Sequence, residues 1–301
     1  MRILMSAAAS AAAISIIKHL QTLGHKVIGI DANENSKSIA MHFCDDFYLS
    51  PLCSSSEFIP FINQLDDKFD LYIPFIDEEL IILSQSSDLS KSISKKILIN
   101  SKSTISICTS KVNFQLFCEE NNLPVAPTST SAPAIFKPEY GRGGKGIYII
   151  EDDELFPFFK NKKGVIQTLL KGTEYTVDVL VDSEGDWVFG LARKRLEAVG
   201  VSRVGEINQH PLVLTLAKKC VEKIRFNGPI NIQIMLDEDR ESAHIIEINP
   251  RLSGSLIFSI NSGFDIIDLS IKSWLSLPYQ IPLEENISDN RLIRYWQEHI
   301  C

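Results

Sequence analysis

Short apolar runs alternate with helix-like stretches over the first hundred residues. The runs with the length and composition of buried strands are 3–5, 27–30, 71–75 and 97–99. Stretches such as 56–64 and 78–84 separate them and have the spacing of amphipathic helices. Regular strand–helix alternation is typical of a parallel sheet covered by helices. We therefore predict an α/β, Rossmann-like domain over residues 1–105.

The pattern changes after residue 105, where apolar runs follow one another as hairpins. The predicted strands are 135–137, 146–150, 165–167, 175–181, 187–192, 231–236 and 244–248. The predicted helices are 111–120, 153–159, 210–224 and 265–275. Hairpins mixed with helices indicate an α+β domain over 106–301. We divide it into a lobe of residues 106–172, which includes a glycine-rich loop, and a lobe of residues 173–301.

The first strand–helix turn argues against a dinucleotide site. Residues 6–10 are Ser-Ala-Ala-Ala-Ser, whereas a pyrophosphate needs glycines at this turn. The apolar run after Arg2 could pass for a signal peptide, but it leads directly into the next strand pattern. We therefore expect this segment to belong to the folded domain, and we exclude an NAD-dependent dehydrogenase.

Composition narrows the function classes. The chain has 301 residues, 45% of them hydrophobic, a net charge of -8 and a pI near 5.3. An acidic balance argues against a nucleic-acid partner, and the chain lacks an apolar run of about 18 residues that could span a membrane. The six cysteines form no CxxC pair, so we expect reduced thiols and a cytoplasmic location.

A glycine-rich loop follows the strand predicted at 135–137. Four glycines occur within residues 141–146, namely Gly141, Gly143, Gly144 and Gly146. Such a loop has free backbone N–H groups that can close over phosphates, and Lys137 at the strand end adds a point charge. The structural alternative is a mobile hairpin loop without a ligand.

A second segment has the features of a nucleoside contact. The strand ending at Gln167 is followed by a short linker that contains Leu169 and Leu170, and then by Glu174. Backbone groups in such a linker can pair with an adenine edge, and the carboxylate can accept from both ribose hydroxyls. Taken by itself, the segment is better explained as a connection with a surface glutamate.

The third segment is a hairpin with unexpected polar positions. A turn centred near Arg240 places two polar pairs opposite each other, Gln233 with Glu247 and Asn231 with Asn249. Side chains alternate along a strand, so positions 247, 249 and 251 share one face. Ile246 and Ile248 then face the core. Polar groups in an otherwise apolar hairpin need a reason.

An oxygen-liganded cation supplies that reason. Magnesium takes carboxylate and amide oxygens together with substrate phosphates, which fits Glu247, Asn249 and Gln233. Arg251 would hold a phosphoryl oxygen where charge develops. A surface salt bridge between Glu247 and Arg251 is the alternative, and it leaves both amides unexplained.

In combination and in this order, the segments resemble the ATP-grasp superfamily, in its carbamoyl-phosphate-synthase-like branch of carboxylate–amine ligases. The resemblance covers nearly the whole chain, and 74–80 looks like the end of the domain that precedes the grasp in such enzymes. Gln167 stands where a glutamate is more usual. The chain ends about fifty residues after Arg251, so no C-terminal accessory domain is expected.

The resemblance implies roles for these residues. Lys111 and Lys137, with the glycine loop, would contact the phosphates of ATP. Gln167 and the Leu169–Leu170 backbone would meet adenine, and Glu174 the ribose. Mg2+, or Mn2+ in its place, would bind Glu247 and Asn249 beside Gln233. The catalytic residues would be Arg251, Lys137 and Arg193.

The resemblance also suggests substrate contacts, which are Asp77, Glu78, Arg195, Arg203, Ser253 and Gly254. Each has a plainer explanation as well. Asp77 and Glu78 begin a predicted helix, where carboxylates favour the helix dipole. Arg193 and Arg195 could be a solvated strand end, and Arg203 could be loop charge.

The implied reaction joins a small-molecule carboxylate to an amine through an acylphosphate, releasing ADP and phosphate. Two alternatives stay open. One is an acylphosphate or carboxyphosphate made for a non-amine acceptor, and the other is a non-catalytic ATP-binding module. The sequence is compatible with a homodimer but contains nothing that determines the oligomeric state.

Overall fold

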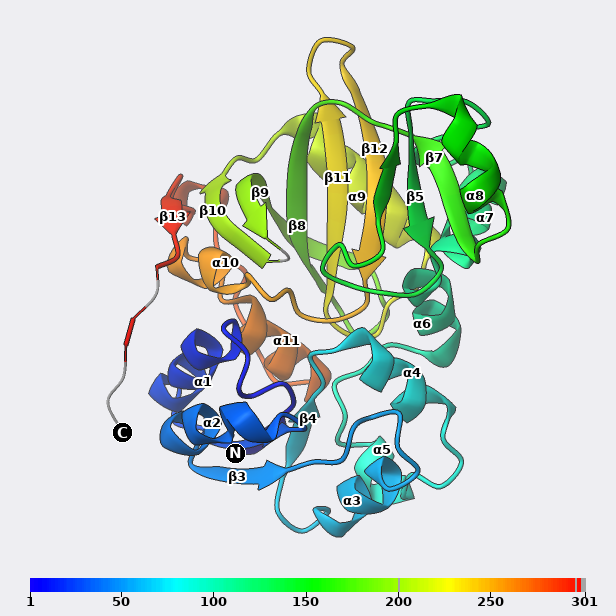
Figure 1. Ribbon diagram of the computed structural model, residues 1–301. Helices are drawn as coiled ribbons and strands as arrows, with labels where there is room; N and C mark the ends of the chain where they lie inside the picture. Colours follow the sequence, from blue (N-terminus) through cyan, green and yellow to red (C-terminus); the bar gives the residue numbers. More distant parts are fainter. Residues whose placement is uncertain (200, 296, 299–301) are drawn as a thin grey trace.

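A parallel sheet forms the first part of the chain (Figure 1). The computed structural model describes residues 1–199, 201–295 and 297–298. The sheet has the order β3-β2-β1-β4, and every pairing in it is parallel. Its strands are β1 (Arg2–Met5), β2 (Lys26–Asp31), β3 (Asp46–Leu49) and β4 (Leu71–Ile73). The predicted parallel pairing is therefore present, and the Rossmann-like designation stays a prediction.

Short helices surround this sheet. They are α1 (Ala13–Thr22), α2 (Lys37–Phe43), α3 (Phe58–Gln64), α4 (Asp77–Gln85) and α5 (Lys91–Ser94), with a 3-10 turn at Glu34–Ser36. The next helix, α6 (Lys102–Thr109), leads away from the sheet and packs against α4, α7 (Lys111–Glu120) and β12 (Ser242–Asn249). The strand predicted at 97–99 is wrong, because Ile97 makes only an isolated bridge to Tyr72. The edge strand β3 was missed by the sequence reasoning because it mixes polar and aromatic residues.

A small antiparallel sheet follows, with the order β6-β5-β7. Its strands are β5 (Ala134–Pro138), β6 (Tyr148–Ile150) and β7 (Gly164–Thr168), flanked by α7 (Lys111–Glu120), a 3-10 turn (Asp153–Leu155) and α8 (Phe156–Lys160). Phe136, Ile150 and Phe159 give it a core of its own. Helix α7 has the predicted bounds, and Ser110 caps it, since its hydroxyl accepts the backbone N–H of Asn113 at 3.2 Å.

The large sheet is antiparallel and has the order β12-β11-β8-β9-β10-β13. Its strands are β8 (Thr173–Val181), β9 (Trp187–Val199), β10 (Val201–Ile207), β11 (Ile230–Asp237), β12 (Ser242–Asn249) and β13 (Arg291–Ile293). Helix α9 (Pro211–Lys223) packs on one face with alternate apolar residues of the strands. The opposite face packs partly against α11 (Ile266–Trp274) through apolar residues such as Leu180 and Leu191, and elsewhere it carries polar side chains.

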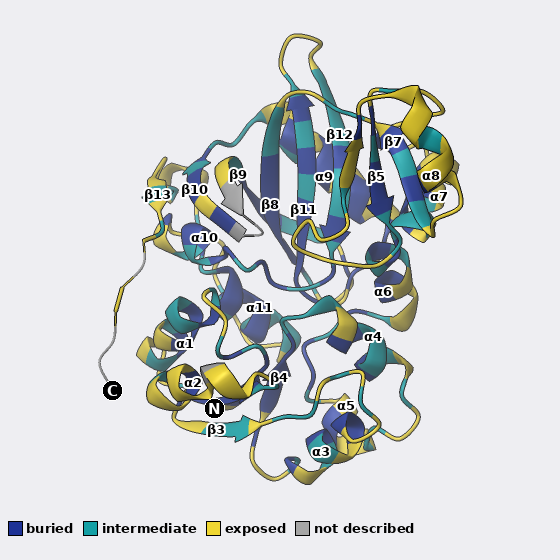
Figure 2. Cartoon of the chain, viewed as in Figure 1, coloured by how far each residue is buried: buried dark blue, intermediate teal, exposed yellow. Residues whose placement is uncertain are grey.

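The last helices return to the first sheet. They are α10 (Ile257–Asn261) and α11 (Ile266–Trp274), followed by a 3-10 turn (Glu284–Asn286). Ile266 and Ile267 of α11 share one buried cluster with Ile3 and Met5 of β1. Figure 2 shows much of α11 in the colour of buried residues. This core crosses the division predicted at residue 105, and the division itself stays a prediction. Among the described helices, none has the length and apolar character needed to cross a bilayer.

Candidate functional site

A cleft lies between the small sheet and the polar face of the large sheet. It has a volume of about 330 Å³ and contains every residue predicted to contact ATP. Those lining residues are Lys111, Lys137, Gly141, Gly143, Gly144, Gln167, Leu169, Leu170 and Glu174. Gln233 and Glu247 line the same cleft. Segments more than a hundred residues apart in sequence therefore meet at one place.

The β11–β12 hairpin brings in its polar residues with the predicted register. Gln233 is paired with Glu247, and Asn231 with Asn249. The prediction for Ile246 is wrong, however, because a register shift follows the Gln233 pair and Ile246 lines the cleft instead of the core. Such a bulge places an extra residue on one strand and redirects its side chain.

The glycine loop requires glycine at several positions. Gly141, Gly143, Gly144 and Gly146 all have positive φ angles, at 137°, 64°, 76° and 75°. Side chains rarely adopt this backbone region, so the loop can bring N–H groups close to a ligand where other residues could not. The loop is exposed and is drawn in front of β11 and β12 (Figure 2).

Two lysines supply positive charge under this loop. Lys111, at the start of α7, donates from Nζ to the Gly141 carbonyl at 2.9 Å. Lys137 is 8% exposed, and this burial lowers its pKa. Glu247 opposes that change in pKa, whereas the charge of Lys111 adds to it. Glu174 also opposes it, and two close cations that these carboxylates only partly compensate suit a polyanionic ligand.

The far end of the cleft fits an adenine. Gln167 is buried, and its Nε2 donates to Gln115 Oε1 at 2.6 Å and to the Ala126 carbonyl at 3.4 Å. Its Oε1 is buried without a partner among the described residues. An orphaned acceptor costs stability unless a ligand donates to it, and the amino group of adenine is such a donor. Glu174 lies nearby and pairs with Arg195.

The other end holds a network of amides and a carboxylate. Asn249 Nδ2 donates to Asn231 Oδ1 at 3.2 Å and to Glu247 Oε1 at 3.3 Å. Asn231 in turn donates to the Arg251 carbonyl at 3.0 Å. Within the described chain, no three His, Cys, Asp or Glu side chains gather into a metal cage. One carboxylate with amide oxygens still fits magnesium, which takes its other ligands from phosphates and water.

Arg251 is held by the first part of the chain. Its Nε donates to Asp77 Oδ1 at 2.6 Å, across the junction with α4. Burial acts to lower the pKa of Arg251, but Asp77 outweighs it and the pKa lies above its ordinary value. Glu78 pairs with Arg142 of the glycine loop at 3.1 Å. Asp77 and Glu78 are therefore counter-ions of two arginines here, rather than open sites for an ammonium group.

A smaller cavity continues the cleft toward α4. Its lining shares Lys111, Gly141 and Glu247 with the cleft and adds Asp77, Glu78 and Asn249. The phosphate and metal candidates therefore adjoin a space bounded by both parts of the chain.

Other predicted residues lie elsewhere. Arg193 is fully buried and pairs with Asp178, so the structure does not bring it to the cleft as a catalytic group. Ser253 does not line the cleft either. Its buried hydroxyl accepts a hydrogen bond from Arg193 at 2.8 Å. Gly254 likewise lies beside this buried cluster. Arg203 is exposed and pairs with Glu197 at 3.0 Å.

Several cleft residues were missed by sequence reasoning. Arg142 and Lys145 lie within the glycine loop, and their charge beside glycines was an available signal. Met235 had no signal, because it is an apolar strand residue that reaches the cleft only through the pairing of β11. Gln115 had none either: it lies buried behind the cleft and accepts from Gln167, which lines it.

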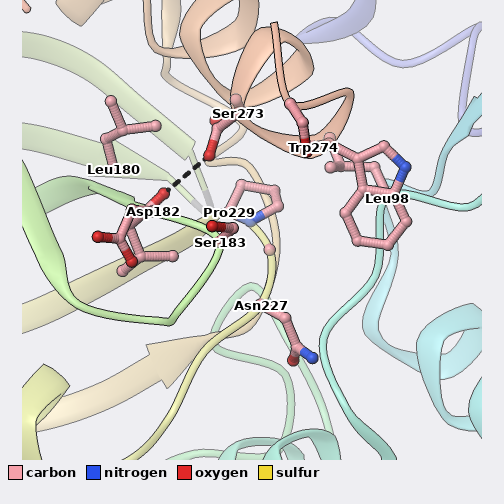
Figure 3. A pocket seen from close by; sticks show the side chains of 12 residues that line it. Leu98, Leu180, Asp182, Ser183, Asn227, Pro229, Ser273 and Trp274 are labelled. Carbon is pink, nitrogen blue, oxygen red and sulfur yellow. Dashed lines mark hydrogen bonds between the residues drawn. The ribbon is translucent and has the colours of Figure 1, made fainter.

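A second cavity of about 160 Å³ lies between the β8–β9 turn and α11 (Figure 3). Leu98, Asn227 and Trp274 are among its walls, and Ser273 donates to the Val181 carbonyl at 3.2 Å. It includes none of the predicted site residues, so the nucleotide cleft is the candidate site.

Comparison with known proteins supports this choice. A family model described as ATP-grasp in the biosynthetic pathway with Ter operon matches residues 160–294. The solved N5-carboxyaminoimidazole synthetase of Staphylococcus aureus has a TM-score of 0.70 at 15% identity, over 93% of this chain and 78% of that one. Residues 160–294 therefore resemble an ATP-grasp domain, and the chain shares its fold with this synthetase. Biotin carboxylase of Campylobacter jejuni has the same fold, with a TM-score of 0.69 at 19% identity, over 96% of this chain and 74% of that one.

The curated proteins that this chain resembles are much longer. The carbamoyl phosphate synthase large chain of Clostridium botulinum (strain Alaska E43 / Type E3) is 31% identical over 162 residues, which are 48% of this chain and 15% of that protein. The corresponding protein of Pseudothermotoga lettingae is 23% identical over 311 aligned residues, or 92% of this chain and 26% of that protein. The chain thus spans about a quarter or less of their length.

Proposed function

We propose that this ATP-grasp chain is an ATP-dependent carboxylate–amine ligase that forms an amide or peptide bond through an acylphosphate. The observation that carries the proposal is the single cleft in which both lysines, the glycine loop, Gln167 and Glu247 meet. A carboxylate oxygen would attack the γ-phosphorus of ATP and release ADP. The amine would then attack the acyl carbon, and phosphate would leave as the nitrogen loses a proton.

The residues divide into binding and charge-stabilising groups. Lys111, Lys137 and the N–H groups of the glycine loop would hold the phosphates, and Gln167 Oε1 would accept from adenine. Glu247, Asn249 and Gln233 would hold magnesium, which supplies neutralisation of charge on the phosphoryl oxygens. Glu174 would face the ribose hydroxyls after giving up part of its contact with Arg195.

Arg251 would stabilise the phosphoryl group during transfer. Its guanidinium is already fixed by Asp77, so it is oriented before the ligand arrives. Preorganised donors of this kind cost little reorganisation at the moment of reaction. A phosphoryl oxygen would take over part of the contact that Asp77 makes in the ligand-free protein.

A second candidate is an enzyme that makes carboxyphosphate. The similar structures include a biotin carboxylase domain dimer, solved with MgADP and bicarbonate, and N5-carboxyaminoimidazole synthetases. Carboxyphosphate formation from bicarbonate would use the same phosphate and metal residues as amide ligation. A homodimer of this chain is likewise a proposal, suggested by that dimeric neighbour.

Phosphate release tests the proposal. The full chain would be incubated with ATP and Mg2+ and a panel of amino acids and other carboxylate–amine pairs, with bicarbonate alone as a separate arm. We expect release that depends on one carboxylate–amine pair, with an amide product found by mass spectrometry. Release with bicarbonate alone would favour the second candidate.

Paired variants assign that release to the metal site. Glu247→Ala should abolish turnover, whereas Glu222→Ala, at an exposed position of α9, should not change it. Full activity of Glu247→Ala would contradict the proposed metal role.

A further inference from the structure

Arg294, placed just after β13, has no counter-ion among the described residues. Its NH2 donates to the Gly254 carbonyl at 2.8 Å, and its guanidinium lies 5.6 Å from the ring centroid of Phe258. Its NH1 is buried and has no partner within the same part of the chain. Burial, together with the charge of Arg193, lowers the pKa of Arg294 to about 10. An ionised group in this position favours an anion beside it.

The neighbouring charges do not supply that anion. Arg193 is bound by the carboxylate of Asp178, which also accepts from Ser259 at 2.6 Å. The Arg193 guanidinium donates to the hydroxyls of Ser253 and Ser255 at 2.8 and 3.0 Å. The Asp178 carboxylate is therefore taken up by Arg193, and the described residues leave the positive charge of Arg294 uncompensated.

This excess charge lies on the same face of the large sheet as the metal candidates. Asp178 is paired with Asn231 across β8 and β11, so the two side chains share a face. Asn231 bonds Asn249, which bonds Glu247. The backbone of Gly254, which binds Arg294, follows Arg251 by only a few residues. Neighbouring polar side chains on this face thus extend from the phosphate end of the cleft to the Asp178–Arg193 pair beside Arg294.

We propose that Arg294 binds a carboxylate of the substrate that is not phosphorylated, such as the α-carboxylate of an amino acid. The identification of the anion as a substrate carboxylate rests on the proposed ligase function. The existence of an anion site at Arg294 does not depend on catalysis. The NH1 donors would form a charge-assisted hydrogen bond with the carboxylate. Arg193 is then a positioning residue, because it fixes Ser253 and Ser255 on either side of the Gly254 carbonyl.

Acetate is the probe that tests the anion site alone. Thermal unfolding of the ligand-free full chain would be followed while sodium acetate replaces sodium chloride at constant ionic strength. A ligand that binds only the folded state raises the unfolding midpoint, so acetate should raise it in the wild type. Arg294→Gln should lose that part of the response, with an apparent acetate affinity reduced about tenfold or more.

Two variants control this result. Arg291→Gln removes an exposed arginine of β13 and should respond to acetate like the wild type. Arg294→Lys keeps the charge and should retain part of the response. Equal acetate responses in the wild type and Arg294→Gln would overturn the proposal, whether or not the protein proves to be a ligase.

A kinetic comparison links the site to the substrate. For the pair that gives phosphate release, Arg294→Gln should raise the KM for the carboxylate substrate about tenfold while leaving the KM for ATP within about twofold. Replacing the spectator carboxylate with an amide should weaken the wild type similarly and the variant no further. Additive losses would overturn the assignment of this carboxylate to Arg294. Absence of ATP binding in the wild type would instead contradict the proposed function and leave the acetate result to decide the anion site.

Discussion

The ion pair between Asp77 and Arg251 joins the two parts of the chain at the phosphate end of the cleft. Its side chains are only 18% and 14% exposed, and the two atoms are 2.6 Å apart. Asp77→Asn keeps the shape of the side chain but removes its charge. Leaving one buried partner uncompensated costs about 3 kcal/mol of folding free energy. We therefore expect this variant to be clearly less stable without ligand.

A matched control is available at the next residue. Glu78 pairs with Arg142, and both side chains are 50% exposed. A pair this exposed contributes less than about 1 kcal/mol, so Glu78→Gln should cost little. The unfolding entropy of a chain of this length is roughly 0.6 kcal/mol per degree. Calorimetry should then show a Tm lower by about 5 °C for Asp77→Asn and by less than about 2 °C for Glu78→Gln.

Ligand addition separates the role of this pair from simple stability. Without Asp77, Arg251 is free to pair with a phosphate, so saturating MgATP should narrow the Tm difference between Asp77→Asn and the wild type. The reasoning is refuted if the two variants lose equal stability without ligand. A Tm difference that widens with MgATP would contradict the phosphate contact of Arg251.

Three further predictions follow from the pKa shifts and from one glycine. Burial raises the pKa of Glu79 from its ordinary value of 4.5 to about 8. Between these two pH values the Glu79 carboxyl keeps its proton in the folded state and has lost it in the unfolded state. Wild-type stability should therefore fall between about pH 5 and pH 8, by on the order of a few kcal/mol, and Glu79→Gln should flatten this dependence in urea titrations. The pKa of Lys137 is lowered, so its charge destabilises the ligand-free protein at neutral pH. Lys137→Met should then raise the ligand-free Tm while weakening ATP binding, and an unchanged ATP affinity would exclude the phosphate contact. Gly172 has φ of 136°, and an added Cβ would lie 2.1 Å from the Leu236 carbonyl. Gly172→Ala should lower the Tm by several degrees, whereas Gly24→Ala, where nothing lies within 4 Å, tests backbone strain alone.

The local parts of the site were predictable from the sequence. The hairpin pairing of Gln233 with Glu247 follows from turn position and strand alternation, and the glycine loop follows from composition. These features depend on residues close together in the chain. The bulge at Ile246 was not predictable, because an alternating pattern does not show where one strand gains a residue.

The partners of the long-range ion pairs could not be predicted from the sequence, for a different reason. Arg193 and Arg251 look alike as arginines beside polar strands. One is closed off by Asp178 in the protein interior, and the other is held by Asp77 at the edge of the cleft. Which partner a charge finds depends on how distant segments pack, and no local spacing encodes it.

Binding of MgATP to the purified full chain tests the central claim most directly. Isothermal titration would compare ATP with Mg2+ and ATP with EDTA, for the wild type, Glu247→Gln and the exposed control Glu222→Gln. We predict saturable binding that requires Mg2+ in the wild type and the control, and a loss of at least about tenfold in affinity for Glu247→Gln. No binding by the wild type, or equal Mg2+-dependent binding by Glu247→Gln, would contradict the account.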